Sequence, residues 1–124
     1  MEIIKNILAV GAGSFVGGAA RYLVSLGMKG IGKGFPWSTL AVNLVGCLMI
    51  GLLWGLLSRN AAENTSWGLF LTVGLCGGFT TFSTFSKEAL AMLQTGQMWG
   101  FASYIAISVL AGIALVALGY YIAR

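Results

Sequence analysis

Four long apolar stretches, separated by short polar ones, divide the chain. They cover residues 4–26, 37–57, 67–93 and 98–122. About 20 mostly apolar residues suffice for a helix to cross a bilayer, so each stretch predicts one membrane-spanning helix. The connections are short, and the sequence therefore predicts an all-α, four-span membrane domain over 1–124 with no separate soluble domain.

Composition agrees with this pattern. The chain is 58% hydrophobic and only 8% charged, whereas soluble domains carry about 25% charged residues. The net charge of +4 is scattered, with no basic run, so a nucleic-acid partner is not indicated. The sequence predicts an integral membrane protein whose surroundings are the lipid bilayer.

The third apolar stretch is unlike the others because polar residues interrupt its middle. Residues 77–85 read Gly-Gly-Phe-Thr-Thr-Phe-Ser-Thr-Phe. Each glycine weakens a helix by roughly 1 kcal/mol, and hydroxyl side chains compete for backbone hydrogen bonds. An unpaired backbone group in hydrocarbon costs several kcal/mol, so such a segment must face protein or a wet cavity. We expect the third helix to be broken at mid-membrane, where ion sites are built.

The charges at the two ends of the spans are nearly balanced. One side of the membrane would hold three cations and the other four, namely Lys5, Arg59 and Arg124 against Arg21, Lys29, Lys33 and Lys87. Orientation follows the bias of lysine and arginine, and a bias of one charge allows insertion either way up. An antiparallel homodimer is then a natural assembly. A single orientation, fixed by a partner or by unequal weighting of the loop charges, remains open.

The predicted membrane interior offers hydrogen-bond donors but no deep acidic residue. Glu88 lies only late in the third span. Cation pathways often use acidic rings, and proton-coupled exporters need a titratable group at depth, so donors without acids favour an anion. Two donors have simpler alternatives: Asn43 could bond a neighbouring helix, and Arg21 could extend to the interface. The donors are Arg21, Thr39, Asn43, Thr80, Thr81, Ser83, Thr84, Tyr104 and Ser108.

Aromatic residues and freed carbonyls add to the candidate site. Phe79, Phe82 and Phe85 are spaced by three and could present their positive ring edges to an anion, although simple packing would give the same pattern. An unwound turn also frees carbonyls that can coordinate Na⁺. Near a two-fold axis, two carbonyls from each subunit would supply four ligands. We interpret Cys47 and Cys76 as small buried hydrophobes, because their spacing fits no metal site.

Three segments resemble the bacterial Fluc (CrcB-type) fluoride channel family. They are Gly-Gly-Ala-Ala-Arg-Tyr at 17–22, Thr-Leu-Ala-Val-Asn-Leu at 39–44, and Gly-Gly-Phe-Thr-Thr-Phe-Ser-Thr-Phe-Ser at 77–86, the last followed by Glu88. The resemblance implies a passive fluoride exporter, not an enzyme, in the bacterial inner membrane. It also implies a dual-topology antiparallel dimer with two narrow pores.

The resemblance also implies roles for individual residues. Asn43 would be the pore amide, with Phe82 and Phe85 meeting the ion by their ring edges. Backbone carbonyls of Gly77 and Thr80 would hold a central structural Na⁺ that is not transported. The fluoride pore would be lined by Asn43, Phe82, Phe85, Ser83, Thr81, Tyr104, Ser108 and Thr39, with Arg21 and Glu88 in vestibule or supporting roles.

One departure from the family pattern and two alternative functions remain to be considered. Some family members continue the polar track of the last span with hydroxyls where this chain has Gly112 and Val116. A small four-span proton-coupled multidrug exporter shares the size and dual topology, but its hallmark is a glutamate deep in the first span. This chain has Gly11, Gly13 and Gly17 there. A non-transporting assembly subunit is the third alternative.

Overall fold

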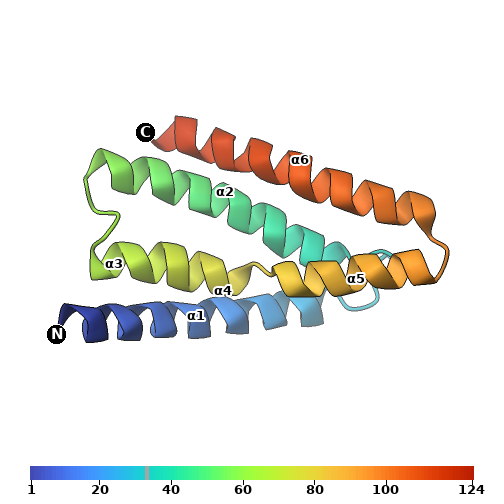
Figure 1. Cartoon of the computed structure of the whole chain (residues 1–124), viewed down its shortest axis with the longest axis horizontal. Helices are drawn as coiled ribbons and strands as arrows, with labels where there is room; N and C mark the ends of the chain where they lie inside the picture. Colours follow the sequence, from blue (N-terminus) through green and yellow to red (C-terminus); the bar gives the residue numbers. More distant parts are fainter. Residues whose placement is uncertain (33) are drawn as a thin grey trace.

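The computed structural model describes residues 1–32 and 34–124, and every regular element in these ranges is helical (Figure 1). Lys33, which enters the charge balance above, lies outside the described residues. The elements are α1 (Glu2–Gly27), α2 (Trp37–Arg59), α3 (Ser66–Leu69), the π-helix η1 (Phe70–Cys76), α4 (Gly77–Phe79), α5 (Phe82–Gln94) and α6 (Met98–Ala123).

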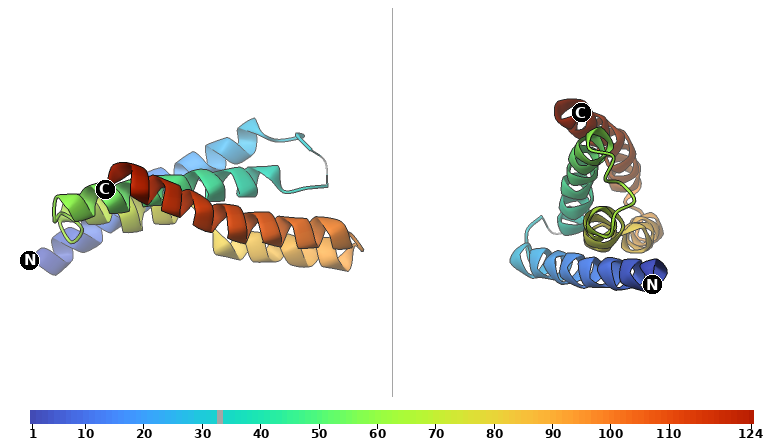
Figure 2. Two further views of the ribbon diagram at one scale, coloured as in Figure 1. Left: turned by 90° about the horizontal axis from the view of Figure 1, so that it is seen from above. Right: turned by 90° about the vertical axis from the view of Figure 1, so that its left-hand side faces the viewer.

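Four helical segments are long and apolar enough to cross a membrane, which confirms the predicted all-α, four-span class. They are Glu2–Gly27, Trp37–Arg59, Ser66–Gln94 and Met98–Ala123. Both termini lie at the same end of the bundle (Figure 1). The third segment, built from α3, η1, α4 and α5, lies between α1 on one side and the α2–α6 pair on the other (Figures 1 and 2).

Glycines bring α1 into direct backbone contact with the third segment. A Cβ added at Gly13 would lie 2.8 Å from the amide nitrogen of Leu75, and one at Gly17 would lie 2.8 Å from that of Phe79. From the other side, a Cβ at Gly78 would collide with the backbone of α1. Gly13 and Gly17 form a GxxxG spacing, which allows this close approach of the two backbones.

Glycines also bring the backbones of α2 and α6 into contact, whereas α5 packs on these two helices through side chains. A Cβ at Gly55 would lie 2.9 Å from the last backbone nitrogen of the chain, just beyond α6, and one at Gly119 would lie 2.6 Å from a backbone nitrogen of α2. Around α5, the core is a cluster of buried side chains, with Phe35, Leu44, Phe85 and Phe101 packed against it. The cluster consists of Leu40, Ala89, Met92 and Tyr104.

The third segment loses its helical backbone at two threonines. Thr80 has φ −93° and ψ 161°, and Thr81 has φ −152° and ψ 121°, both extended. The paired glycines, which we expected to weaken the helix, are instead helical within α4. Gly78 is needed for contact with α1, so its missing side chain serves packing rather than unwinding. The π-helical turn of η1, just before α4, was not predicted.

Candidate functional site

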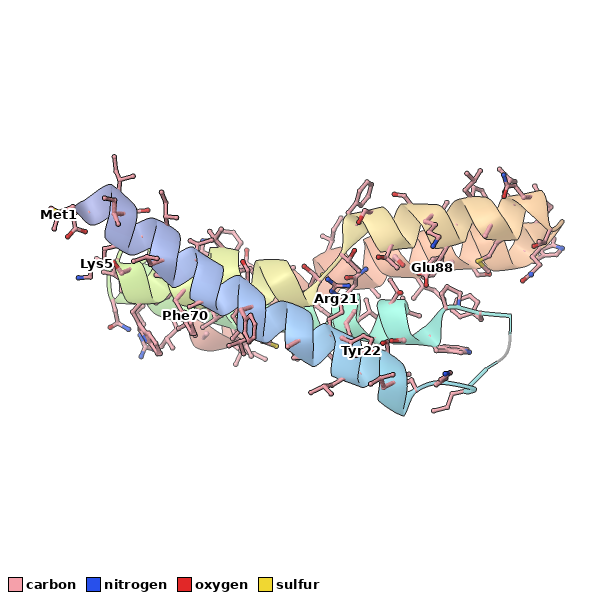
Figure 3. The ribbon with its side chains drawn as sticks, turned by 90° about the horizontal axis from the view of Figure 1, so that it is seen from below. Met1, Lys5, Arg21, Tyr22, Phe70 and Glu88 are labelled. Atoms are coloured by element: carbon pink, nitrogen blue, oxygen red, sulfur yellow. The ribbon has the colours of Figure 1, made fainter. Side chains whose placement is uncertain are left out.

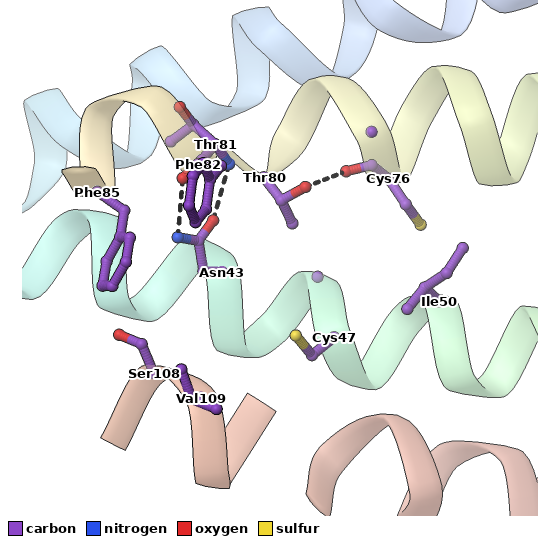
Figure 4. Close-up of a pocket in the computed structure, with 12 residues that line it drawn as sticks. Asn43, Cys47, Ile50, Cys76, Thr80, Thr81, Phe82, Phe85, Ser108 and Val109 are labelled. Carbon is purple, nitrogen blue, oxygen red and sulfur yellow. Dashed lines mark hydrogen bonds between the residues drawn. The ribbon is translucent and has the colours of Figure 1, made fainter. Parts of the chain in front are cut away.

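The candidate site is built around the extended backbone of Thr81. The Asn43 side chain from α2 pairs with both polar groups of this residue (Figure 4). Its Nδ2 donates to the Thr81 carbonyl at 3.1 Å, and its Oδ1 accepts from the Thr81 amide at 2.8 Å. The Asn43 side-chain amide thus replaces the backbone hydrogen bonds that Thr81 would make in an unbroken helix. The Thr81 hydroxyl then accepts from the Thr84 amide at 3.2 Å and caps α5.

Asn43 keeps one donor after this pairing. A primary amide carries two N–H groups, and a single hydrogen on Nδ2 suffices for the bond to Thr81. The other hydrogen points away from Thr81. Figure 4 shows the amide nitrogen on the side of Phe85 and the amide oxygen on the side of Thr80. The helix–helix role and the pore role of Asn43 are therefore compatible within one side chain.

Arg21 supports the other side of the interruption. Its Nε donates to the Gly78 carbonyl at 3.2 Å. In an unbroken helix this carbonyl would accept from Phe82, four residues later. Sequence reasoning placed Arg21 with the cations at the far end of the first span, whereas it lies part-buried beside the junction of α4 and α5 (Figure 3). A positive charge therefore sits next to the extended threonines.

A cavity of about 390 Å³ opens beside Asn43. The Ser108 hydroxyl borders this cavity, and its oxygen is buried with no hydrogen-bond partner among the described residues. A buried polar group without a partner costs roughly 1–3 kcal/mol, so a hydrogen-bond partner supplied by a ligand would be favourable here. The cavity is lined by Asn43, Gly46, Cys47, Ile50, Cys76, Gly77, Thr80, Thr81, Phe82, Phe85, Ser108 and Val109.

Phe82 and Phe85 both border the cavity, but their surroundings differ. Their ring centroids are 5.8 Å apart. Phe85 packs on the Tyr104 ring at 4.9 Å, whereas Phe82 is 79% exposed. Phe85 is therefore fixed by its own subunit, and Phe82 is free to contact a neighbouring molecule or lipid.

Three predicted site residues form a separate cluster among α2, α5 and α6. Tyr104 is fully buried, and its hydroxyl donates to Oε1 of Glu88 at 2.9 Å. Thr39, also buried, lies beside the Tyr104 hydroxyl. Sequence reasoning set Glu88 at the polar end of the third span and missed this pair. One signal was available: Glu88 shares a helical face with Phe85 and Met92, which point into the core.

The remaining predicted residues lie close to the interruption. Ser83 lies 3.4 Å from Thr81, hydroxyl oxygen to hydroxyl oxygen, on an exposed surface. The Thr80 hydroxyl donates back to the Cys76 carbonyl at 3.0 Å. Within the described ranges, no hydrogen-bond donor pairs with the backbone carbonyls of Gly77 and Thr80, and no cluster of His, Cys, Asp or Glu could hold a metal.

Comparison with known proteins gives matches over nearly the whole chain. The family described as "CrcB-like protein, Camphor Resistance (CrcB)" matches residues 8–120. A relative from Desulfotalea psychrophila is 43% identical over 100% of this chain and 96% of its own length. One from Phocaeicola vulgatus is 44% identical over 98% and 100% of the two chains. One from Agrobacterium fabrum is 42% identical, with 96% of each covered.

All three relatives are named "Fluoride-specific ion channel FluC", which is the name of a channel and not of an enzyme. With four helices that can cross a membrane, the chain is a multi-pass membrane protein. Both the family match and the relatives agree with the resemblance found in the sequence. The chain belongs to the CrcB-like family of FluC channels.

Proposed function

We propose that this protein is a passive, fluoride-selective channel that lets fluoride leave the bacterial cytoplasm across the inner membrane. The observation that carries the proposal is the cavity beside the extended threonines. It is lined by Asn43, by Ser108 with its unpartnered hydroxyl and by two phenylalanines, and among the described residues no acidic side chain lines it. The names of the full-length relatives support the choice of fluoride among anions.

The chemistry of the cavity suits a small, strongly hydrated anion. Such an ion gives up its water only where other donors replace it. Asn43 and Ser108 supply hydrogen-bond donors, and the edges of Phe82 and Phe85 supply partial positive charge. The membrane potential drives anions outward with about 2.3 kcal/mol per 100 mV. A passive channel therefore suffices for export.

The other predicted residues hold these groups in place in this proposal. Thr81 fixes the Asn43 amide, and Ser83 stands next to Thr81 at the exposed side. The Tyr104 ring packs on that of Phe85, and Thr39 lies beside the Tyr104 hydroxyl. Arg21 adds positive charge beside the passage, and Glu88 orients Tyr104.

An antiparallel homodimer completes each passage in the proposal. Phe82 is a large apolar side chain, exposed at the edge of the cavity, where an inverted second copy could cover it. Arg21 bonds the backbone beside the interruption, so it no longer counts among the cations at the membrane surface. The count of three against four cations in the sequence then becomes three against three. Such a balance gives neither orientation an advantage.

A structural Na⁺ at the two-fold axis of the dimer fits the residues present. The backbone carbonyls of Gly77 and Thr80 have no hydrogen-bond donor among the described residues, and freed carbonyls are the ligands that Na⁺ uses in interrupted membrane helices. When bound, the ion would supply a fixed positive charge between the two subunits. Replacing Na⁺ by a large organic cation on both sides of the membrane is expected to destabilise the dimer.

Ion efflux from liposomes tests the proposed function. Purified protein is reconstituted into liposomes loaded with potassium fluoride, and valinomycin is added to carry the countercharge. We expect external fluoride, read with a fluoride electrode, to rise to the value reached on detergent lysis, with no pH change beyond that of protein-free liposomes. Proton movement coupled to a cationic drug would instead identify a multidrug exporter. The absence of any flux would indicate a non-transporting subunit.

A further inference from the structure

Cys47 borders the same cavity as the proposed fluoride-binding groups. It lies four residues after Asn43 on α2, so the two side chains share one helical face. Both line the cavity, as does Ser108 on α6. The Ser108 hydroxyl, buried and unpartnered, points independently to a ligand in this space. The sulfur of Cys47 therefore extends a row of donor groups along the cavity.

The residue opposite Cys47 explains why the sulfur fits there. Gly112 lies four residues after Ser108 on α6 and is buried. A Cβ added at Gly112 would have the Cys47 sulfur as its neighbour, at 3.3 Å. The thiol thus occupies the space beside α6 that a side chain at position 112 would use. Asn43 and Ser108 line the cavity, and Cys47 lines it one helical turn further along α2.

From this arrangement we infer that the Cys47 thiol lines the anion passage and is a binding site for soft, thiol-seeking metal species that block it. The inference rests on the proposed function, because a passage is needed for a block. Gly112 has no side chain and so provides no donor one turn after Ser108. The S–H group of Cys47, which lies beside Gly112, is a weak donor. A metal bound to the sulfur would stand in the cavity that Asn43 and Ser108 also line.

Mercuric chloride is a suitable probe because its neutral, linear molecule can enter an apolar cavity. Its reaction with the thiol is a simple exchange. The S–H bond of Cys47 and one Hg–Cl bond break, an S–Hg bond forms, and a proton and a chloride ion leave. No group is oxidised or reduced. An added dithiol such as dithiothreitol competes for the mercury and restores the free thiol.

Cys76 provides an internal comparison. It borders the same cavity from η1, but the residue is only 3% exposed, whereas Cys47 is partly exposed. Both thiols are free. We therefore expect mercury to bind Cys47 first. Serine is the matched replacement at both positions, because it keeps a small donor and removes the sulfur.

The test measures fluoride efflux and mercury adducts on the same liposomes, each variant being compared with its own untreated rate. Mercuric chloride should reduce efflux through the wild type and Cys76→Ser to the protein-free background, reversibly by dithiothreitol, and leave Cys47→Ser unaffected. Mass spectrometry of the wild type should place the adduct on Cys47. Full efflux with an adduct on Cys47 would overturn the inference, as would an adduct on Cys76 alone or a block that persists in Cys47→Ser.

The two proposals fail differently in this experiment. No fluoride efflux from untreated liposomes would overturn the proposed function and, with it, the passage role of Cys47. Efflux that resists mercury would overturn only the role of Cys47. If Cys47→Ser yields no folded protein, the position of the adduct on the wild type and the recovery by dithiothreitol decide the question.

Discussion

The two halves of the third membrane-spanning segment are held by different means. Before Thr80, η1 and α4 lie against α1, with glycines bringing backbone against backbone. After Thr81, α5 leaves α1 and packs on α6 through large side chains, among them Phe85, Met92 and Tyr104 (Figures 1 and 2). The segment thus changes its partner helix at the two extended threonines.

This contrast shows how one segment serves packing and binding together. A backbone contact through glycine tolerates no added atom, so the first half forms a rigid support. The second half presents side chains, and these can border a cavity. The change of partner needs an interruption of the helix, and the interruption leaves polar backbone groups to be paired. Asn43 and Arg21 pair three of them, and Asn43 also lines the cavity that we propose as the anion site.

The largest expected effect comes from the first half of the segment. Gly17→Ala would push a methyl group against the Phe79 amide nitrogen, 2.8 Å from the new Cβ, so α1 must move away. We expect a loss of about 3 kcal/mol or more in the free energy of unfolding, at the upper end for overpacked sites. The measurement is thermal unfolding in detergent. Gly18→Ala is the matched control, because a Cβ there meets nothing within 4 Å.

A similar loss of stability in both variants would contradict the contrast. It would mean that α1 tolerates neither glycine replacement, for reasons of its own helix. Equal stability of Gly17→Ala and the wild type would show that backbone contact with α4 is not needed.

The next effect concerns the interruption itself. Asn43→Ala removes both bonds to the Thr81 backbone and the remaining N–H. We expect fluoride efflux to fall by about tenfold or more, because leaving a buried group unpaired costs roughly 1–3 kcal/mol and about 1.4 kcal/mol corresponds to tenfold. Asn43→Asp should lower efflux further, because a carboxylate cannot donate to the Thr81 carbonyl and repels anions.

The control for this prediction is Asn60→Ala. Asn60 also bonds a backbone carbonyl, that of Leu56 at 3.0 Å, but in an exposed turn after α2. Fluoride efflux through the Asn60→Ala variant should equal that through the wild type. Unchanged efflux in folded Asn43→Ala protein would remove Asn43 from the passage.

The smallest effect is expected in the second half. Tyr104→Phe keeps the ring against Phe85 and removes only the bond to Glu88. A hydrogen bond contributes roughly 0.5–1.5 kcal/mol to the free energy of unfolding, so unfolding should become easier by about that amount. A double-mutant cycle with Glu88→Gln measures the coupling. Coupling near zero, with each single variant as stable as the wild type, would show that the pair does not hold α5 on α6.

Sequence patterns predicted the fold well because hydrophobic length alone defines membrane spans. They also singled out candidate residues, since hydroxyls and an asparagine are rare inside a span, and the roles of these residues stay predictions. The hydrogen-bond partners could not be predicted. No local sequence feature indicates that Asn43 bonds Thr81, 38 residues away, or that Tyr104 bonds Glu88. The paired glycines were misjudged for the same reason. Their effect on an isolated helix is to weaken it, and only the presence of α1 turns Gly78 into a packing contact.

The most direct test of the central claim compares two halides in the same liposomes. Within the part of the chain that the structure describes, the cavity is lined by few donors, by two phenylalanines and by no acidic group, and we propose that it conducts fluoride. Wild-type protein should release trapped fluoride to the level of detergent lysis while trapped chloride remains at the protein-free background. Retention of both ions, or their release at equal rates, would contradict the account.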